Sequence, residues 1–309
     1  MVRSALSIIG LKLAQVLIWM LSLVPLRPLH ALARPLAVLY RLRSRRKSRI
    51  VKANLALAFP QLDNKQRQQL AHDNSVEMLR LVLETGAVWH WSRQRLLAHV
   101  PRVEGQALLN EAVRDSRGLL LLGGHQGNWE LLTLFTTLQL DFVGLYRAPA
   151  QAALQRAITR SRERFGGQLV ASGGSAMRRL LRQLRTGGAA GLLIDQAPRQ
   201  GDGAFAPFFD RAALTMTLPH RLARKTGCRI IFGDCARLPR GRGWAIRYRE
   251  PPAAVYSDDE AIALGAMNRT LSELIDDHRS QYLWRYKRFA PQPEGQPDPY
   301  ERREACVRP

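Results

Sequence analysis

Short apolar runs alternate with amphipathic segments through most of the chain after residue 100. The runs are too short for buried helices and therefore predict strands. They lie at 118–122, 142–146, 189–194, 229–236 and 244–248. The segments between them show a helical spacing of apolar positions and lie at 129–139, 150–165, 175–186 and 214–226. This alternation predicts an α/β fold in which helices flank a mostly parallel central sheet.

The N-terminal segment is strongly apolar. Residues 5–26 are almost wholly apolar apart from Lys12 and Gln15, and a helix of this length would reach roughly 33 Å, enough to cross hydrocarbon. Arginines and a lysine follow between 27 and 49 with no acid among them, and basic residues beside a span stay on the cytoplasmic side. We therefore predict a retained membrane-anchor helix. An amphipathic core helix is the alternative.

These patterns divide the chain into four regions. The membrane anchor takes 1–27, and a basic juxtamembrane and helical region takes 28–100, with a capped helix start at Asp63 and a break near Gly86. The α/β core takes 101–289. The tail from 290 to 309 contains Pro and Glu and is predicted to be disordered.

The charge balance indicates anionic partners. The net charge is +22, which suits an anionic membrane surface, a phosphorylated lipid or an acidic carrier protein. Aromatic residues make up only 7% of the chain and no nucleic-acid-binding motif occurs, so nucleic acid is not expected. The cysteines Cys228, Cys235 and Cys306 have no metal-ligand spacing, which predicts no metal site and a reducing compartment.

The segment from Gly118 to Glu130 carries the main candidate chemistry. A buried strand leads through two glycines to His125, and Asn128 is a suitable N-cap for the helix that follows. His125 and Glu130 can face each other only because this turn lies between them. A carboxylate bound to one imidazole nitrogen leaves the other free to take a proton, which predicts a His–Glu general base. The alternative is a helix-capping histidine beside a solvated acid.

Three further candidates follow predicted strands. Ligands gather where parallel strands end, and both Asp195 and Gln196 come directly after such an end. Asp195 could bind a substrate hydroxyl or hold an arginine, or it could simply begin a turn. Arg147 also follows a strand, and its guanidinium suits a phosphate.

The block Gly-His125-Gln-Gly-Asn-Trp-Glu130 resembles the His-x4-Asp/Glu signature of the glycerolipid acyltransferase superfamily, in the form seen in lipid A biosynthesis acyltransferases. Further blocks in the family's order begin at Tyr146, Arg162, Gly191, Phe205 and Tyr282, so that the resemblance covers about residues 1 to 289. The chain departs from the family pattern at Ala148 and at Gln196-Ala197. These departures bear on acceptor and chain-length specificity and leave the reaction class unchanged.

The resemblance implies a membrane-bound enzyme of lipopolysaccharide biosynthesis on the cytoplasmic face of the inner membrane, with no cofactor. Acyl carrier protein would donate a fatty acyl thioester, and a hydroxyl of a phosphorylated lipid A precursor would accept the chain. Arg147 and Arg164 become candidate ligands of a substrate phosphate, and Asp195 and Gln196 candidate substrate-binding residues. Acyl transfer to a glycerophospholipid, ornithine lipid or other glycolipid stays open, as do hydrolysis and non-catalytic membrane binding.

Overall fold

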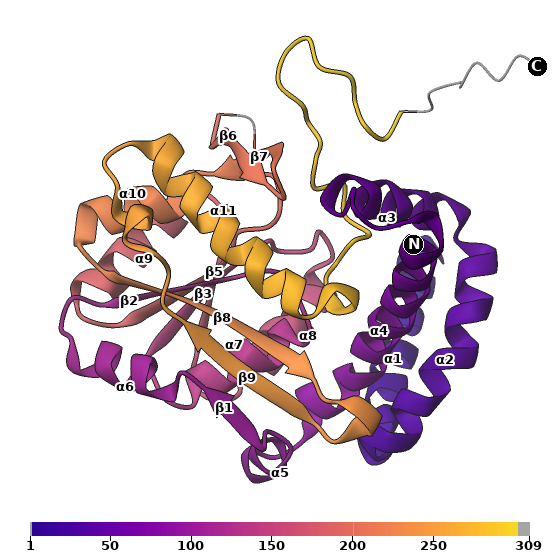
Figure 1. Cartoon of the computed structure of the whole chain (residues 1–309). Coiled ribbons are helices and arrows are strands. Elements are labelled where there is room, and N and C mark those ends of the chain that lie inside the picture. The colour runs from indigo at the N-terminus through magenta and orange to yellow at the C-terminus, as the bar shows by residue number, and fades with distance from the viewer. Residues whose placement is uncertain (1, 200, 302–309) are drawn as a thin grey trace, which may run out of the picture.

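The computed structural model describes residues 2–199 and 201–301. A sheet-based core stands beside a group of N-terminal helices, α1 to α4 (Figure 1). The helices are α1 (Val2–Leu23), α2 (Leu26–Arg43), α3 (Arg45–Ala58), α4 (Asn64–His90), α5 (Arg93–Ala98), α6 (Gln106–Arg114), α7 (Trp129–Thr137), α8 (Ala152–Glu163), α9 (Gly174–Arg185), α10 (Leu218–Thr226) and α11 (Glu260–Asp277).

The central sheet is mostly parallel, as predicted. Its strands run in the order β1-β9-β8-β2-β5-β3-β4, and among these neighbours only β8 and β9 are antiparallel. Their bounds are β1 (Arg102–Glu104), β2 (Leu119–Gly123), β3 (Phe142–Tyr146), β4 (Gln168–Ala171), β5 (Ala189–Leu193), β8 (Arg229–Arg237) and β9 (Trp244–Arg249). A separate hairpin joins β6 (Gly203–Phe208) to β7 (Arg211–Met216).

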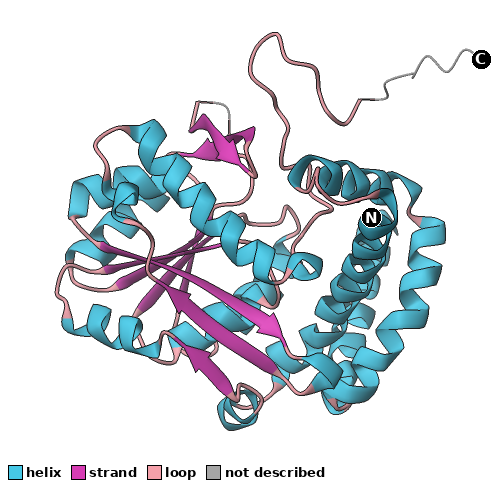
Figure 2. Ribbon diagram, in the orientation of Figure 1, coloured by secondary structure: helices cyan, strands magenta, loops and turns pink. Residues whose placement is uncertain are grey.

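Helices cover both faces of the sheet (Figure 2). Strand β2 shows why, because all of its residues are buried and successive side chains alternate between two apolar clusters. Leu120 and Leu122 pack with residues of α9, α10 and α11. Leu119 and Leu121 pack with residues of α6 and α7 on the other face. The unbroken apolar run therefore reflects a central strand with both faces in a core.

Some elements differ from the sequence prediction. Residues 214–216 belong to strand β7, and the helix predicted at 214–226 begins at Leu218. The strands β1, β4 and β6 were not predicted. They lie at sheet edges or in the hairpin, where their residues are partly exposed and the apolar pattern is weak.

The predicted break near Gly86 is also wrong. Helix α4 begins at the predicted capping box of Asp63 and Gln66 and runs through Gly86 without interruption. A side chain on Gly86 would place its Cβ 2.4 Å from the carbonyl oxygen of Ile18 in α1. The glycine therefore allows two helix backbones to cross closely, which the sequence cannot distinguish from a helix break.

The N-terminal segment forms helix α1, which packs along α4. Over the residues the structure describes, no helix combines enough length with enough apolarity to pass through a bilayer. The predicted spanning anchor at 1–27 is therefore not supported. From residue 10 onward, the apolar residues of α1 are divided between a side that contacts α4 and an exposed side, which carries Leu13, Val16, Leu17, Met20 and Leu23.

The C-terminal segment has no helix or strand between residues 290 and 301. Within it, the Tyr300 hydroxyl accepts a hydrogen bond from the backbone N–H of Phe289 at 3.0 Å and contacts Asn54 of α3. The rest of the predicted tail, residues 302–309 with Cys306, lies outside the described residues. Cys228 and Cys235 are buried and unpaired in the described chain.

Candidate active site

Strand register brings His125 and Asp195 together. The neighbouring parallel strands β2 and β5 pair residue for residue, with Gly123 opposite Leu193. The chain continues for two residues beyond each strand, to His125 after β2 and to Asp195 after β5. Because parallel strands end at the same edge of a sheet, the two side chains meet although they are separated by 70 residues.

Asp195 holds the imidazole of His125 by two contacts. One carboxylate oxygen lies 2.8 Å from Nδ1, and the other accepts the backbone N–H of His125 at 2.9 Å. Asp195 is 1% exposed, whereas the His125 side chain is 20% exposed. The carboxylate therefore assigns the proton to Nδ1 and leaves Nε2 unprotonated on the open side. The indole of Trp129 packs edge-on at 4.9 Å between ring centroids and fixes the ring plane.

Asp195 is ionised although it is buried. Burial alone would raise its pKa, but the adjacent His125 and its two hydrogen bonds, with the charge of Arg288, bring the pKa below the ordinary value of 3.8. A carboxylate that stays charged favours an imidazole that can become imidazolium. This is the electrostatic arrangement that a general base requires.

The turn that carries His125 is fixed by backbone contacts. Gly127 has a φ of +57° and lies against Cys235, where an added Cβ would be 1.9 Å from the carbonyl oxygen. The N–H groups of Gly127 and Asn128 donate to the carbonyl oxygens of Gln281 and Cys235. Both N–H groups are therefore already engaged and are not free to bind an oxyanion. The Asn128 side chain caps α7 as predicted.

Glu130 does not hold His125, which corrects the predicted His–Glu pair. Its carboxylate instead pairs with Arg162 of α8, with 2.6 Å from Nε to one oxygen and a second contact from the terminal nitrogen. Burial would lower the pKa of Arg162, but Glu130 reverses this and raises it. Because α7 turns Glu130 away from the strand end, the partner closest in sequence is not the partner in space.

A cavity of about 230 Å³ lies in front of this group. Its charged and polar residues include His125, Glu130, Arg147, Arg162 and Gln196. Its apolar residues include Leu121, Leu132, Phe142, Leu145, Leu169 and Leu193. The cavity thus joins a polar mouth to an apolar interior between the sheet and α7.

Two of the predicted substrate-binding residues stand at this mouth. The amide nitrogen of Gln196 lies 3.4 Å from Nε2 of His125, which marks the side from which a polar group can approach the imidazole. Arg147 is exposed and lines the same cavity. Arg162 is the residue that sequence reasoning missed, although it opens one of the blocks that carried the family resemblance.

Comparison with known proteins agrees with this geometry. The family model of bacterial lipid A biosynthesis acyltransferases matches residues 3–290. The chain is 25% identical to the lipid A biosynthesis lauroyltransferase of Escherichia coli K12 over 284 residues, 92% of each chain. It is 27% identical to the palmitoleoyltransferase of the same strain over 257 residues, 83% of each chain. A lipid A biosynthesis acyltransferase of Haemophilus influenzae is 25% identical over 252 residues, 81% of this chain and 79% of the relative.

The chain belongs to the bacterial lipid A biosynthesis acyltransferase family. It is therefore an acyltransferase of lipid A synthesis. The resemblance stated from the His125 block and the blocks that follow it is confirmed.

In this acyltransferase, the guanidinium of Arg164, which was predicted to bind a substrate phosphate, makes hydrogen bonds with the main chain. Its two terminal nitrogens donate to the carbonyl oxygens of Trp91 and Val88, at 2.6 and 2.8 Å. These carbonyls belong to the C-terminal end of α4, where a helix leaves acceptors unsatisfied. Burial lowers the pKa of Arg164 to about 10. Arginine spacing in the sequence does not separate a helix cap from a phosphate ligand.

A second group of buried polar residues forms hydrogen bonds with the turn that carries His125. Glu84 of α4 accepts hydrogen bonds from Asn128 and from Arg237, each at 2.8 Å, and lies 2.7 Å from His30 of α2. Arg237 also donates to the carbonyl oxygen of Gly127 at 2.9 Å. Helices α2 and α4 thus reach the turn that carries His125 through buried hydrogen bonds. The sequence pattern contains no signal of these contacts.

Proposed function

We propose that this acyltransferase moves a fatty acyl chain from an acyl-carrier-protein thioester to a hydroxyl of a phosphorylated lipid A precursor. The observation that carries the mechanism is the His125 imidazole, held at Nδ1 by Asp195 and open at Nε2 to an apolar-backed cavity. The net charge of +22 suits both an acidic carrier and a phosphorylated acceptor.

In the proposed reaction, His125 is the general base and Asp195 orients it. Nε2 removes the proton of the acceptor hydroxyl while the oxygen attacks the thioester carbonyl carbon. A tetrahedral oxyanion forms, the C–S bond breaks, and the departing thiolate takes the proton from Nε2. The acyl group ends as an ester on the acceptor, and His125 returns to its starting state.

We assign separate binding roles to the two arginines at the mouth of the cavity. Arg162 is held by Glu130 beside His125, so we assign it to the oxyanion, where a fixed cation is most effective. Arg147 is exposed at the rim, and we assign it to a phosphate of the acceptor. Gln196, within reach of Nε2, positions the attacking hydroxyl. In this proposal Glu130 acts by positioning Arg162.

The apolar part of the cavity is assigned to the donor acyl chain. The leucines and Phe142 behind His125 offer hydrocarbon contacts and no charge. The exposed apolar side of α1, from Leu13 to Leu23, is assigned to the membrane surface, on which a bilayer-embedded acceptor would be met. The location proposed is the cytoplasmic face of the inner membrane.

Mass spectrometry of lipid A from cells with and without this protein tests the assignment. An added acyl mass that appears with the wild-type protein and is lost with His125→Ala is expected. A purified donor and acceptor panel then separates lipid A precursors from glycerophospholipids and ornithine lipids. Unchanged lipid A, together with transfer to one of those other acceptors, would contradict the acceptor proposed here.

A further inference from the structure

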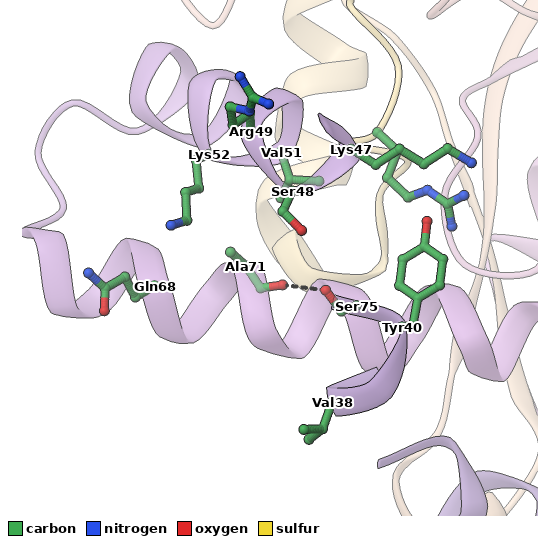
Figure 3. Close-up of a pocket in the computed structure, with 11 residues that line it drawn as sticks. Val38, Tyr40, Lys47, Ser48, Arg49, Val51, Lys52, Gln68, Ala71 and Ser75 are labelled. Atoms are coloured by element: carbon green, nitrogen blue, oxygen red, sulfur yellow. Dashed lines mark hydrogen bonds between the residues drawn. The ribbon is translucent and has the colours of Figure 1, made fainter. Parts of the chain in front are cut away.

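A second, larger cavity lies between α2, α3 and α4, apart from the one beside His125. Its volume is about 700 Å³, and its eleven lining residues share none with the catalytic cavity. They come from three helices and from the segment after η3 (Arg279–Gln281). Figure 3 shows α3 above the cavity, α4 below it, and Tyr40 of α2 at one end.

The charges in this cavity are all positive. Lys47, Arg49, Lys52 and Arg285 line it, and no lining residue is acidic. In Figure 3 the side chain of Lys52 descends from α3 toward α4, whereas Arg49 points away on the outer rim. The guanidinium of Arg285 stacks 5.1 Å from the ring centroid of Tyr40. A multiply charged anion is the ligand that such a cavity favours.

The start of α3 strengthens this preference. Helix α3 opens with Arg45, Arg46 and Lys47, it has no acid in its first turn, and its N-cap Ser44 makes no side-chain cap. The N-terminal end of a helix carries partial positive charge and unsatisfied N–H groups. Cations at this end are unfavourable by themselves, and an anion placed there would relieve both the repulsion and the missing hydrogen bonds.

A buried hydroxyl in the cavity also lacks a partner. The Tyr40 oxygen is shielded from solvent and has no hydrogen-bond partner within the described chain. Tyr40 lines the cavity together with Ser48, whose hydroxyl points into it from α3 (Figure 3). A buried donor without an acceptor costs free energy, and an anionic oxygen in the cavity would satisfy it.

The remaining walls of the cavity are apolar and continue to the outside of the molecule. Val51 of α3 and Ala71 of α4 are buried, whereas Val38 of α2 is 52% exposed. Leu39, next to Val38 in the chain, and Leu32, about two helical turns before Leu39, are also exposed on α2. The polar group and the apolar surface are thus adjacent, as a ligand with a charged head and hydrocarbon chains requires.

We infer that this cavity binds the phosphate headgroup of an anionic membrane phospholipid, whose chains run along the exposed apolar residues of α2. Lys47, Lys52 and Arg285 hold the phosphate, Tyr40 and Ser48 donate hydrogen bonds to it, and the opening of α3 faces it. This site is separate from the proposed acceptor site at His125 and does not depend on that proposal.

The site has a physical connection to the catalytic turn. Arg285 lies between Trp284 and Tyr286, whose carbonyl oxygens accept hydrogen bonds from Asn54 of α3, both at 2.7 Å. Two residues before Arg285, the backbone N–H of Leu283 donates to the carbonyl oxygen of His125 at 3.0 Å. A lipid held by Arg285 therefore rests on the same segment that supports His125.

The test is titration of the full-length protein with dihexanoyl phosphatidylglycerol below its micelle concentration, followed by calorimetry. A Lys47→Ala, Lys52→Ala double variant is expected to raise the Kd roughly 25-fold, at about fivefold per cation removed. The matched control is Arg221→Ala, Lys225→Ala, which removes the same charge from exposed positions on α10 and should leave the Kd unchanged. Tyr40→Phe should weaken binding roughly fivefold without a change of charge.

Three outcomes would overturn the inference. An equal loss of affinity for phosphatidylglycerol in the double variant and in the α10 control would mean that binding depends only on net charge. Inorganic phosphate that binds as tightly as phosphatidylglycerol would show a simple anion site with no lipid preference. Displacement of phosphatidylglycerol by acyl carrier protein, with the loss of carrier binding in the double variant, would assign the cavity to the acidic carrier.

Discussion

His125 and His30 form the same chemical pair in two different settings. Each imidazole lies against a buried carboxylate, Asp195 at 2.8 Å and Glu84 at 2.7 Å. His125 uses Nδ1 and presents Nε2 to a cavity, whereas His30 uses Nε2 and is 3% exposed. The comparison teaches that access to the second nitrogen, rather than the pair itself, separates the proposed proton-transfer site from the structural one.

The two carboxylates differ in the number of residues with which they form hydrogen bonds. Asp195 hydrogen-bonds His125 through both the ring and the backbone N–H, and Tyr282 and Arg288 lie close enough to interact with its charge. Glu84 accepts from His30, Asn128 and Arg237, all of them buried. A carboxylate that holds three elements together contributes mainly to folding and to the position of the turn, so substitutions in the two pairs should have different consequences.

The largest expected effect is on activity at the open pair. His125→Ala removes the proposed base, and general-base catalysis is typically worth about 10² to 10⁴ in rate. We expect kcat/KM for acyl transfer to fall within that range while the far-UV circular dichroism stays unchanged. Near-wild-type turnover in a folded His125→Ala protein would refute the assignment.

Asp195→Asn should come next. The asparagine oxygen must accept the backbone N–H of His125, so its amide group would face Nδ1 and move the ring proton to Nε2. An imidazole protonated at Nε2 is no base, and we expect kcat to fall by at least about 10² with little change in KM. Steady-state kinetics on matched preparations measure this. A loss confined to KM would indicate a substrate-binding role instead.

At the closed pair, Glu84→Gln should act on stability. The variant keeps hydrogen-bonding atoms but leaves buried Arg237 with the more distant Glu77, at 3.7 Å, as its counter-charge. Breaking the closer buried pair costs about 3 kcal/mol of unfolding free energy. Urea denaturation measures this cost. At temperatures where the variant is folded, it should retain more activity than Asp195→Asn. The opposite order would mean that the network behind the turn, and not the Asp195 pair, controls catalysis.

The smallest expected effect is the pH dependence of the stability that Glu84 contributes at the closed pair. Burial alone would raise the pKa of Glu84, but Arg237, His30 and Asn128 together lower it below 4.5. A carboxyl with a lowered folded-state pKa stabilises the protein above its unfolded pKa, and this stability is lost as the pH falls through the folded value. The stability gap between wild type and Glu84→Gln should therefore narrow below pH 4.5. A gap that widens on acidification would contradict this sign.

The sequence predicted much of the core. The runs at 142–146 and 189–194 match β3 and β5 within one residue, because fully buried strands show uninterrupted apolar residues between turns. The turn at His125 was also located, since the glycines and Asn128 carry local signals that need no tertiary context. Edge strands and the β6–β7 hairpin lack such signals, and they were missed or assigned to helix.

What the sequence determined by itself was the class of fold, the family and the identity of the proposed base. Tertiary structure alone decided the partner of that base. Proximity along the chain favoured Glu130, but α7 directs Glu130 to Arg162, and the register of β2 with β5 supplies Asp195. Periodicity reports which face of an element is buried, whereas the pairing of strand ends depends on which strands become neighbours. For the same reason, the sequence alone could not show that Gly86 allows α1 to cross α4 closely, or that one side of the apolar helix α1 packs on α4.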